Sequence, residues 1–437
     1  MRGMKLGRGF SALQHYNYRL FWIGQTLSLV GTWMQTVAQA WLVLQLTGSA
    51  VDLGIVSALQ QLPVLFIGIF GGVFADRAPK RELLIVTQTV QMLLALVLGI
   101  LVSTGLVQMW HVYLLATLLG LSNAFDMPTR QAFVMEMVGR DDLMNAVALN
   151  SMQFNTARII GPALAGITIA LIGVTGSFYA NAASFLFVIA GLFMMRSDKF
   201  FAVERAPKAP VLSSLREGCE YVWRTPSALL IVLIVGLLGM FTFNTQVLVP
   251  LFATDILHSG ALGYGILLTG MGAGSLVAAF VAAFAQRARW RLVIGGAIGI
   301  CLTELAFSFS RNYGLSLGLM VLTGFSMITM FTSANTGIQQ RVPDSLRGRV
   351  MGVYTSVNMG TMPLGNLAAG ALAASLGAPF AMGFGAVAAL LTTAAIGSRI
   401  YLRRAEDPMQ LEPEGFLEPQ PSPLSQRQPA AAAAKPA

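Results

Sequence analysis

Three polar residues at helical spacing stand inside a long apolar stretch of the chain. Ser151, Asn155 and Arg158 follow one another at steps of four and three, which places them on one face of a helix. A charge at the centre of a bilayer costs about 2.5 to 3.5 kcal/mol, so an arginine there is a functional hypothesis. Arg158 could attract an anionic or catecholate-like ligand, or repel protons from a water-filled path. The alternative is a structural arginine bonded to carbonyls of a neighbouring helix.

Acidic residues inside apolar stretches are the groups that could carry protons. Glu304 is the acid that lies well inside such a stretch. Desolvation favours the protonated form of a membrane carboxylate, which lets it exchange protons near neutral pH. A structural role is the alternative for Glu304. Asp52 and Asp255 fall at the ends of apolar stretches and are further candidates for proton coupling.

Other polar residues form stripes that lipid would not face. In residues 20–45 they recur at steps of three and four, namely Gln25, Ser28, Thr32, Gln35 and Gln39. The second half of the chain offers counterparts, namely Asn244, Gln246, Tyr354, Asn358 and Thr361. Such residues either contact a ligand in a cavity or pack between helices.

The composition limits the class of protein that holds these residues. The chain has 437 residues, 55% hydrophobic and 11% charged, with a mean hydropathy of +0.68, whereas a soluble domain carries about 25% charged residues. We therefore expect a membrane protein with many transmembrane helices. Its two cysteines and three histidines are too scattered for a disulfide framework or a metal site. No lysine follows glycine as in a phosphate-binding loop. We expect neither an enzyme nor a cofactor.

Long stretches without charge predict an all-α membrane fold with twelve transmembrane helices, since about 20 apolar residues cross a bilayer. Turn residues divide the longest stretches. The predicted spans are approximately 20–45, 51–74, 83–104, 109–127, 145–172, 176–195, 226–253, 262–285, 291–310, 313–332, 350–376 and 379–401.

The distribution of basic residues predicts the orientation of these spans. Of 28 Lys and Arg residues, 26 fall in the two terminal segments or in the loops after even-numbered spans; the exceptions are Arg158 and Arg311. Basic loops resist translocation, so both termini should be cytoplasmic. The net charge of +9 belongs to this face and indicates contact with anionic lipid rather than nucleic acid.

A polar linker divides six spans from six. We expect a cytoplasmic N-terminus (1–19), a six-helix bundle (20–195), a linker (196–225), a second bundle (226–402) and a disordered cytoplasmic tail (403–437). Within the linker an amphipathic helix is predicted by apolar residues at helical spacing, namely Leu212, Leu215, Cys219 and Val222. Phe74–Arg81 recurs as Phe284–Arg291 at an offset of 210, which indicates two pseudo-symmetric bundles around a midplane cavity.

The segment Gly72–Leu83 resembles a signature of the major facilitator superfamily, usually written G-x-L-A-D-R-x-G-R-R-x-L, with Phe74, Pro79 and Lys80 as departures. In that family the motif latches the two halves on the cytoplasmic side. The resemblance implies this role for Gly72, Asp76, Arg77, Lys80 and Arg81, with Asp126 as a further partner. The first span of that fold lines the cavity, which favours ligand contact for the stripe in residues 20–45. The ninth span is peripheral, which favours a structural Glu304.

A second resemblance lies in the fifth span. Residues 148–166 follow the antiporter motif G-x8-G-x3-G-P-x2-G-G, with Gly161, Pro162 and Gly166 kept and three glycines replaced by alanine. Small residues allow close helix packing and proline bends the helix, although packing alone also explains the pattern. The motif is associated with exporters that exchange substrate for protons.

Further segments resemble the enterobactin-exporter-like branch of that superfamily: 18–25, 46–49, 128–133, 145–146 and 150–151. The branch handles siderophores and assorted drugs. We therefore expect a monomeric, proton-coupled exporter of an amphipathic small molecule in the bacterial inner membrane. An uncoupled facilitator, an importer on the same fold and a non-transporting receptor are the alternatives.

Overall fold

The computed structural model describes residues 10–202, 211–284 and 290–402, and every regular element in these ranges is helical. The first half contains the 3-10 helix η2 (Ser11–Gln14), α1 (Tyr16–Thr47), α2 (Ala50–Arg77), α3 (Lys80–Ser103), α4 (Met109–Val138), α5 (Leu143–Ile172) and α6 (Val174–Met194). The linker contains η3 (Ser197–Lys199) and α7 (Val211–Arg224). The second half contains α8 (Pro226–Phe241), α9 (Thr245–Leu251), the π-helical turn η4 (Phe252–Ile256), α10 (Gly260–Phe284), α11 (Trp290–Phe309), α12 (Tyr313–Gln339), α13 (Asp344–Leu376) and α14 (Ala378–Leu402).

Within the described residues, ten helical segments are long and apolar enough to cross a bilayer. The long helices outside this set are α4 and α13, which carry polar side chains along their length, among them Asn123, Asp126, Asn358 and Asn366. The all-α membrane fold is thus confirmed, and the number of twelve spans stays a prediction.

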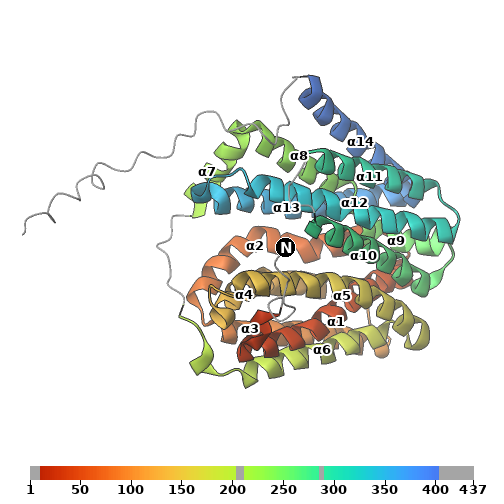
Figure 1. Cartoon of the computed structure of the whole chain (residues 1–437). Helices are drawn as coiled ribbons and strands as arrows, with labels where there is room; N and C mark the ends of the chain where they lie inside the picture. The colour runs from red at the N-terminus through yellow and green to blue at the C-terminus, as the bar shows by residue number, and fades with distance from the viewer. Residues whose placement is uncertain (1–9, 203–210, 285–289, 403–437) are drawn as a thin grey trace, which may run out of the picture.

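The helices pack as two groups, one above the other in Figure 1. In the lower group α1 packs on α5 and α6, α2 on α4, and α3 on α4 and α6. In the upper group α10 packs on α12, α11 on α12 and α14, and α13 on α8 and α14. The groups meet where α2 lies against α13 and where α5 lies against α10.

The connections alternate between two ends of the molecule. The basic end carries the start of α1, the connections 78–79, 139–142 and 340–343, and α7. The far end carries the connections 48–49, 104–108, 257–259 and 310–312, together with Gly173 and Gly377. Each of these two glycines has a positive φ, at 78° and 86°, which lets the chain reverse between helices without steric strain.

The apolar core joins the two groups at the far end. One buried cluster there draws on both groups and includes Val37 and Leu42 of α1 together with Val247, Phe252 and Leu267 of the second half. At the basic end the buried clusters are separate, and each belongs to one group. Burial of apolar surface therefore holds the groups together at the far end.

Close backbone contact strengthens this junction. A Cβ atom on Gly54 of α2 would lie 2.7 Å from the carbonyl oxygen of Asn366 in α13. A Cβ atom on Gly265 of α10 would overlap the carbonyl oxygen of Pro162 in α5. Glycine at these positions lets the helices approach more closely than any side chain would allow.

Three helices run further towards the basic end than the predicted spans 109–127, 313–332 and 350–376. The structure extends α4 to Val138 and α12 to Gln339, and α13 begins at Asp344. The added turns of α4 carry charges that are paired, because Arg130 bonds Asp126 and Lys80 of α3 lies 2.5 Å from Glu136. Paired charges let the helix continue where the sequence criterion ended the span.

The predicted span 226–253 is interrupted at Thr242–Asn244, between α8 and α9. The side-chain Nδ2 of Asn244 donates to the carbonyl oxygens of Met240 and Phe241 at 3.2 and 3.3 Å. The side-chain amide thus bonds carbonyl oxygens that backbone N–H groups would bond in a continuous helix. This competition favours a break in the helix at this point.

The predicted amphipathic helix of the linker is present as α7, which packs on α13. Tyr221 is buried there, and a Cβ atom on Gly218 would lie 2.7 Å from the carbonyl oxygen of Arg349. The Arg349 guanidinium also pairs with Glu217. Cys219, expected on the apolar face, is exposed.

Candidate functional site

Arg158 lies at the middle of α5, where the two groups of helices meet. Its Nη2 lies 3.8 Å from the sulfur of Met327 in α12. Within the described residues, the Arg158 side chain makes no other polar contact. The backbone on either side is also at the interface, because Thr269 of α10 donates to the carbonyl oxygen of Ile159 at 3.3 Å. The guanidinium carries five donors, so most of them are left for water or a ligand.

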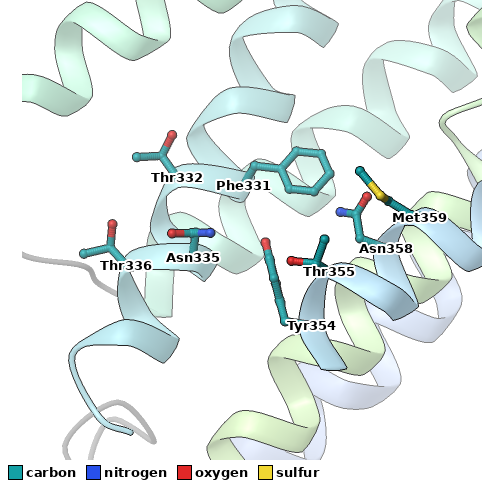
Figure 2. A pocket seen from close by; sticks show the side chains of 8 residues that line it. All are labelled: Phe331, Thr332, Asn335, Thr336, Tyr354, Thr355, Asn358 and Met359. Atoms are coloured by element: carbon teal, nitrogen blue, oxygen red, sulfur yellow. The ribbon is translucent and has the colours of Figure 1, made fainter. Parts of the chain in front are cut away.

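A cavity of about 400 Å³ opens between α12 and α13 of the second group. Figure 2 shows four side chains from each helix around it, namely Phe331, Thr332, Asn335, Thr336, Tyr354, Thr355, Asn358 and Met359. All eight are uncharged. The sequence had indicated Tyr354 and Asn358 as ligand contacts, and both line the cavity.

The residues of α12 that line this cavity were not predicted from the sequence. Polar residues recur in α12 at steps of three, one and three, and this spacing predicts a polar face. They are Thr332, Asn335, Thr336 and Gln339. Phe331 begins this face and stacks on Phe243, with ring centroids 5.1 Å apart. Aromatic stacking fixes the Phe331 ring as a rigid wall.

Arg158 contacts α12 one helical turn from the wall of this cavity, without lining it. Its partner Met327 stands one helical turn before Phe331 on the same face of α12, a rise of about 6 Å. The first group therefore contributes a cation next to an uncharged cavity of the second group. Asn155, one turn before Arg158, donates to the carbonyl oxygen of Ser151 at 2.8 Å.

The polar stripe of α1 is largely bonded within the first group. Asn181 of α6 donates to Gln35 Oε1 at 2.7 Å, and Gln60 of α2 donates to Gln39 Oε1 at 3.0 Å. Gln25 is buried, and its Oε1 has no partner among the described residues. Thr32 is exposed and bonds the carbonyl oxygen of Ser28, one turn earlier in the same helix.

Other predicted contacts of the second half lie outside the cavity. Gln246 lines a second, much smaller pocket of about 20 Å³ with residues of α1 and α2, among them Gln39 and Gln60. Thr361 lies against Gly239 of α8. Asn244 caps the break after α8, as described above. None of these three side chains lines the larger cavity.

The basic residues predicted to form a latch bond within the first group. Arg81, at the start of α3, donates to the carbonyl oxygens of Leu192 and Phe193 at 2.7 and 3.0 Å, which caps the end of α6. Lys80 pairs with Glu136 of α4. In this conformation both side chains tie helices of one group to each other.

Other latch residues have fewer described contacts. Arg77 ends α2 and is exposed, and Gly72 lies near Pro128 of α4. The side chain of Asp76 lies outside the described residues, as do positions 285–289 of the repeated segment.

Asp126 is fully buried in a hydrogen-bond network between α3 and α4. Its Oδ1 accepts from Thr87 Oγ1 at 2.8 Å and from Gln88 Nε2 at 2.7 Å. Its Oδ2 pairs with Arg130, one turn further along α4. The carboxylate is thus neutralised inside the first group.

The antiporter-like motif of α5 faces two helices. Gly161 lies against Trp33 of α1, and a Cβ atom on Gly166 would lie 3.2 Å from the backbone of Leu262 in α10. Pro162 contacts Gly265 of α10 through its carbonyl oxygen. The motif therefore contributes to the closed junction at the far end.

The three carboxylates considered for proton coupling occupy different environments. Glu304 is 5% exposed within α11 and has no hydrogen-bond or ion-pair partner in the described part of the chain. Asp52, at the far end, accepts a hydrogen bond of 2.6 Å from Tyr113. Asp255 is exposed in η4. Among the described residues no group of three His, Cys, Asp or Glu side chains could hold a metal ion.

Comparison with known proteins agrees with this architecture. A sequence model of the transmembrane secretion effector family matches residues 8–428. The multidrug efflux pump Tap of Mycolicibacterium fortuitum is 30% identical over 357 residues, which cover 79% of this chain and 87% of Tap. The enterobactin exporter EntS of Shigella boydii is 24% identical and aligns over 85% of this chain and 89% of EntS.

The staphyloferrin A transporter of Staphylococcus aureus is 25% identical over 80% of this chain and 87% of its own length. Among solved structures, the nucleoside transporter NupG superposes with a TM-score of 0.70 at 12% identity, over 88% of this chain and 99% of NupG. The last similarity concerns the fold alone.

Proposed function

Because the chain belongs to the transmembrane secretion effector family of the major facilitator superfamily, we propose that it exports an amphipathic small molecule in exchange for protons. It is a multi-pass membrane protein of a bacterial transporter family, and that family is not an enzyme class. The observation that carries the proposal is the cavity between α12 and α13, beside the Arg158 side chain of the opposite group.

Transport in this proposal follows alternating access, in which bundles 20–195 and 226–402 rock around the central site. The excess of Lys and Arg at the basic end supports a cytoplasmic location for that end and for both termini, with the protein in the inner membrane. The shared apolar core and the α2–α13 and α5–α10 contacts favour a state closed at the far end. Substrate would then enter from the cytoplasm.

The latch would form in the opposite state. Arg77 is exposed here, so it is available to bond when the basic ends of the two groups approach. The connection between α2 and α3 would be held in place by Lys80, Arg81 and Asp126 through their contacts in the first group. Gly161, Pro162 and Gly166 would help to keep the far end sealed in the conformation described here, before the exchange.

The proposed substrate class is inferred from the relatives of this chain. The names of Tap and EntS refer to multidrug efflux and to enterobactin export, which favours drug-like or siderophore-like molecules for this chain. Arg158 would contact an acidic group of the molecule or keep protons out of the path. Proton exchange would use Glu304, with Asp52 and Asp255 as the other candidates. The protein would act as a monomer.

The proposal is tested by efflux from pump-deficient cells loaded with dyes, antibiotics or siderophores, with and without a protonophore. Wild type should show protonophore-sensitive efflux. Arg158→Ala should lose it at equal membrane expression, and Arg158→Lys should keep part of it because the charge remains. Arg311→Ala is the matched control, since Arg311 caps the carbonyl of Ser308 at the far end.

Two outcomes would contradict the proposal. Efflux that is unchanged by the protonophore would support passive facilitation on the same fold. Movement of the panel into the cells, dependent on the proton gradient, would support an importer.

A further inference from the structure

We propose that the cavity between α12 and α13 binds an uncharged aromatic group of the transported molecule, with the Tyr354 hydroxyl as hydrogen-bond donor. The inference rests on the proposed function and makes it specific, because it names the helices and the group that select the substrate. It places recognition in one of the two groups of helices rather than equally in both.

The size and lining of the cavity suit such a group. Its volume of about 400 Å³ falls in the usual range for small-molecule pockets, about 300 to 1,000 Å³. Phe331 and Met359 supply apolar surface, while Asn335 and Asn358 supply amides. None of the eight lining side chains is charged, so an ionic group would lose water without gaining an opposite charge there.

Phe331 is the rigid surface against which an aromatic ring would stack. The stack of Phe331 on Phe243 holds one face of the Phe331 ring. Figure 2 shows the ring of Phe331 directed between Asn358 and Met359, at the side of the cavity facing α13. Thioether and aromatic groups both favour contact with a π face.

Tyr354 is the polar group that points to a ligand. Its side chain is 5% exposed, and within the described residues its hydroxyl has no hydrogen-bond partner. Figure 2 shows the phenol rising from α13 towards Phe331 and Asn335 of α12. An unpaired buried hydroxyl costs free energy, and a ligand with a hydrogen-bond acceptor would recover this cost.

In the described part of the opposite group, two of the polar residues of α1 are already bonded. Gln35 and Gln39 of α1 accept hydrogen bonds from Asn181 and Gln60, which belong to the same group. Their side-chain oxygens already accept hydrogen bonds from neighbouring helices, whereas the Tyr354 hydroxyl has no partner among the described residues. The first group then contributes mainly the Arg158 cation, which contacts Met327 one helical turn from the cavity wall.

A matched pair of probes tests this inference directly. The ligands 2-acetonaphthone and 2-ethylnaphthalene share one ring system, and the first adds a carbonyl acceptor. Their affinities for the full-length protein in lipid nanodiscs are measured by equilibrium dialysis, with empty nanodiscs to correct for partition into lipid. Tyr354→Phe should weaken 2-acetonaphthone about fivefold, the size of one neutral hydrogen bond. Its affinity for 2-ethylnaphthalene should stay unchanged.

Two further variants locate the effect. Phe331→Ala should weaken both probes, because the ring wall is lost. Tyr264→Phe is the control, since Tyr264 is another buried tyrosine with an unpartnered hydroxyl, in the far-end core and away from this cavity. It should leave both affinities unchanged.

The inference is overturned if Tyr354→Phe changes neither affinity, if Tyr264→Phe has the same effect, or if wild type binds neither probe. Its failure is separable from that of the proposed function, which is measured as protonophore-sensitive efflux. Coupled efflux without a Tyr354 effect on probe binding would refute only this cavity assignment. A selective Tyr354 effect without efflux would refute only the exporter.

Discussion

Asn366 of α13 donates a hydrogen bond of 2.7 Å to the hydroxyl of Ser57 in α2, and both side chains are buried. This bond joins the two groups of helices on the far-end side of the molecule. Beside it, the smaller pocket is lined by Ser57, Gln39, Gln60 and Gln246. The closed far end therefore combines an apolar core with a directed polar contact, which would have to break in the proposed alternating access.

The first prediction concerns this bond. Asn366→Ala should shift the population towards the state open at the far end by about fivefold, since one buried neutral hydrogen bond contributes about 1 kcal/mol. Labelling of a cysteine placed at Ala40, which lines the smaller pocket, reports on the opening. The background carries serine at Cys219 and alanine at Cys301, and an impermeant maleimide is added from outside.

Ser275→Ala is the control for this experiment. The Ser275 hydroxyl donates to carbonyl oxygens of Met271 and Gly324, both in the second group. Its loss should not change the labelling rate. Equal labelling of wild type and Asn366→Ala would show that the bond does not bias the equilibrium.

The second prediction concerns the contact of Gly265 with Pro162. Gly265→Val should reduce efflux at least tenfold, because its side chain would overlap the Pro162 carbonyl and hold α5 and α10 apart. Gly295→Val is the matched control, since nothing lies within 4 Å of a Cβ atom at Gly295. Efflux rates are compared at equal expression, with thermal unfolding in detergent to confirm folding. A normal rate in Gly265→Val would show that close approach of these helices is dispensable.

The third prediction concerns Asp126. Asp126→Ala should lower the free energy of unfolding by about 3 kcal/mol, because it leaves Arg130 without its partner and the buried Gln88 amide without its acceptor. The melting temperature of the purified protein measures this effect. Glu220→Ala removes an exposed ion pair with Arg224 and should have almost no effect. Equal melting temperatures for the two variants would refute a structural role for the network.

The fourth prediction concerns pH and the attachment of η2 to α5. Ser11 Oγ lies 2.5 Å and His15 Nε2 2.8 Å from the carboxylate of Asp142. The hydrogen bonds from Ser11 and His15 hold the pKa of this carboxyl below its ordinary value. A lowered pKa stabilises the attachment above the ordinary carboxyl pKa, and this stabilisation is lost as the pH falls through the lowered value.

Hydrogen exchange of residues 10–15, corrected for the intrinsic rate, should therefore accelerate on acidification below that range. Asp142→Asn should remove this pH dependence. Asp141→Asn changes an exposed neighbour and should retain it. Protection that stays constant with pH in the wild type would contradict the assignment.

The fifth prediction concerns proton coupling through Glu304. Glu304→Gln keeps the size of the side chain and removes the ability to lose a proton, so efflux should no longer respond to an imposed proton gradient. Glu220→Gln, on the exposed side of α7, is the control for the removal of a carboxylate. The measurement is efflux in proteoliposomes with and without a pH gradient. A Glu304→Gln variant that remains coupled would leave Asp52 and Asp255 as the candidates.

The helices could be predicted from sequence because apolar runs of this length must satisfy their backbone internally. The C-terminal end of α4 could not be predicted in this way. A charged residue such as Arg130 marks the end of an apolar run, but the helix continues through it because Asp126 pairs with it. The break after α8 depends on which way the Asn244 side chain turns, and this is settled by packing rather than by local sequence.

The site was partly predictable for a similar reason. Spacing identifies a polar face, which places Tyr354 and Asn358 in one cavity and would have identified Asn335 on the facing helix. Spacing does not reveal partners: Gln35 and Gln39 share the same pattern, yet each is bonded by a side chain from another helix. Only the tertiary fold separates polar groups that hold helices together from those left for a ligand.

The apolar core shared by both groups at the far end also sets how the transporter responds to temperature. In the proposed alternating access, opening that end would expose side chains such as Val37, Val247 and Phe252 to water, and exposure of apolar surface raises the heat capacity. The enthalpy difference between the two conformations then changes with temperature, so the transport rate should follow a curved rather than a linear Arrhenius plot. Cooling weakens the hydrophobic contribution to closure, which shifts the resting population towards the conformation open at the far end.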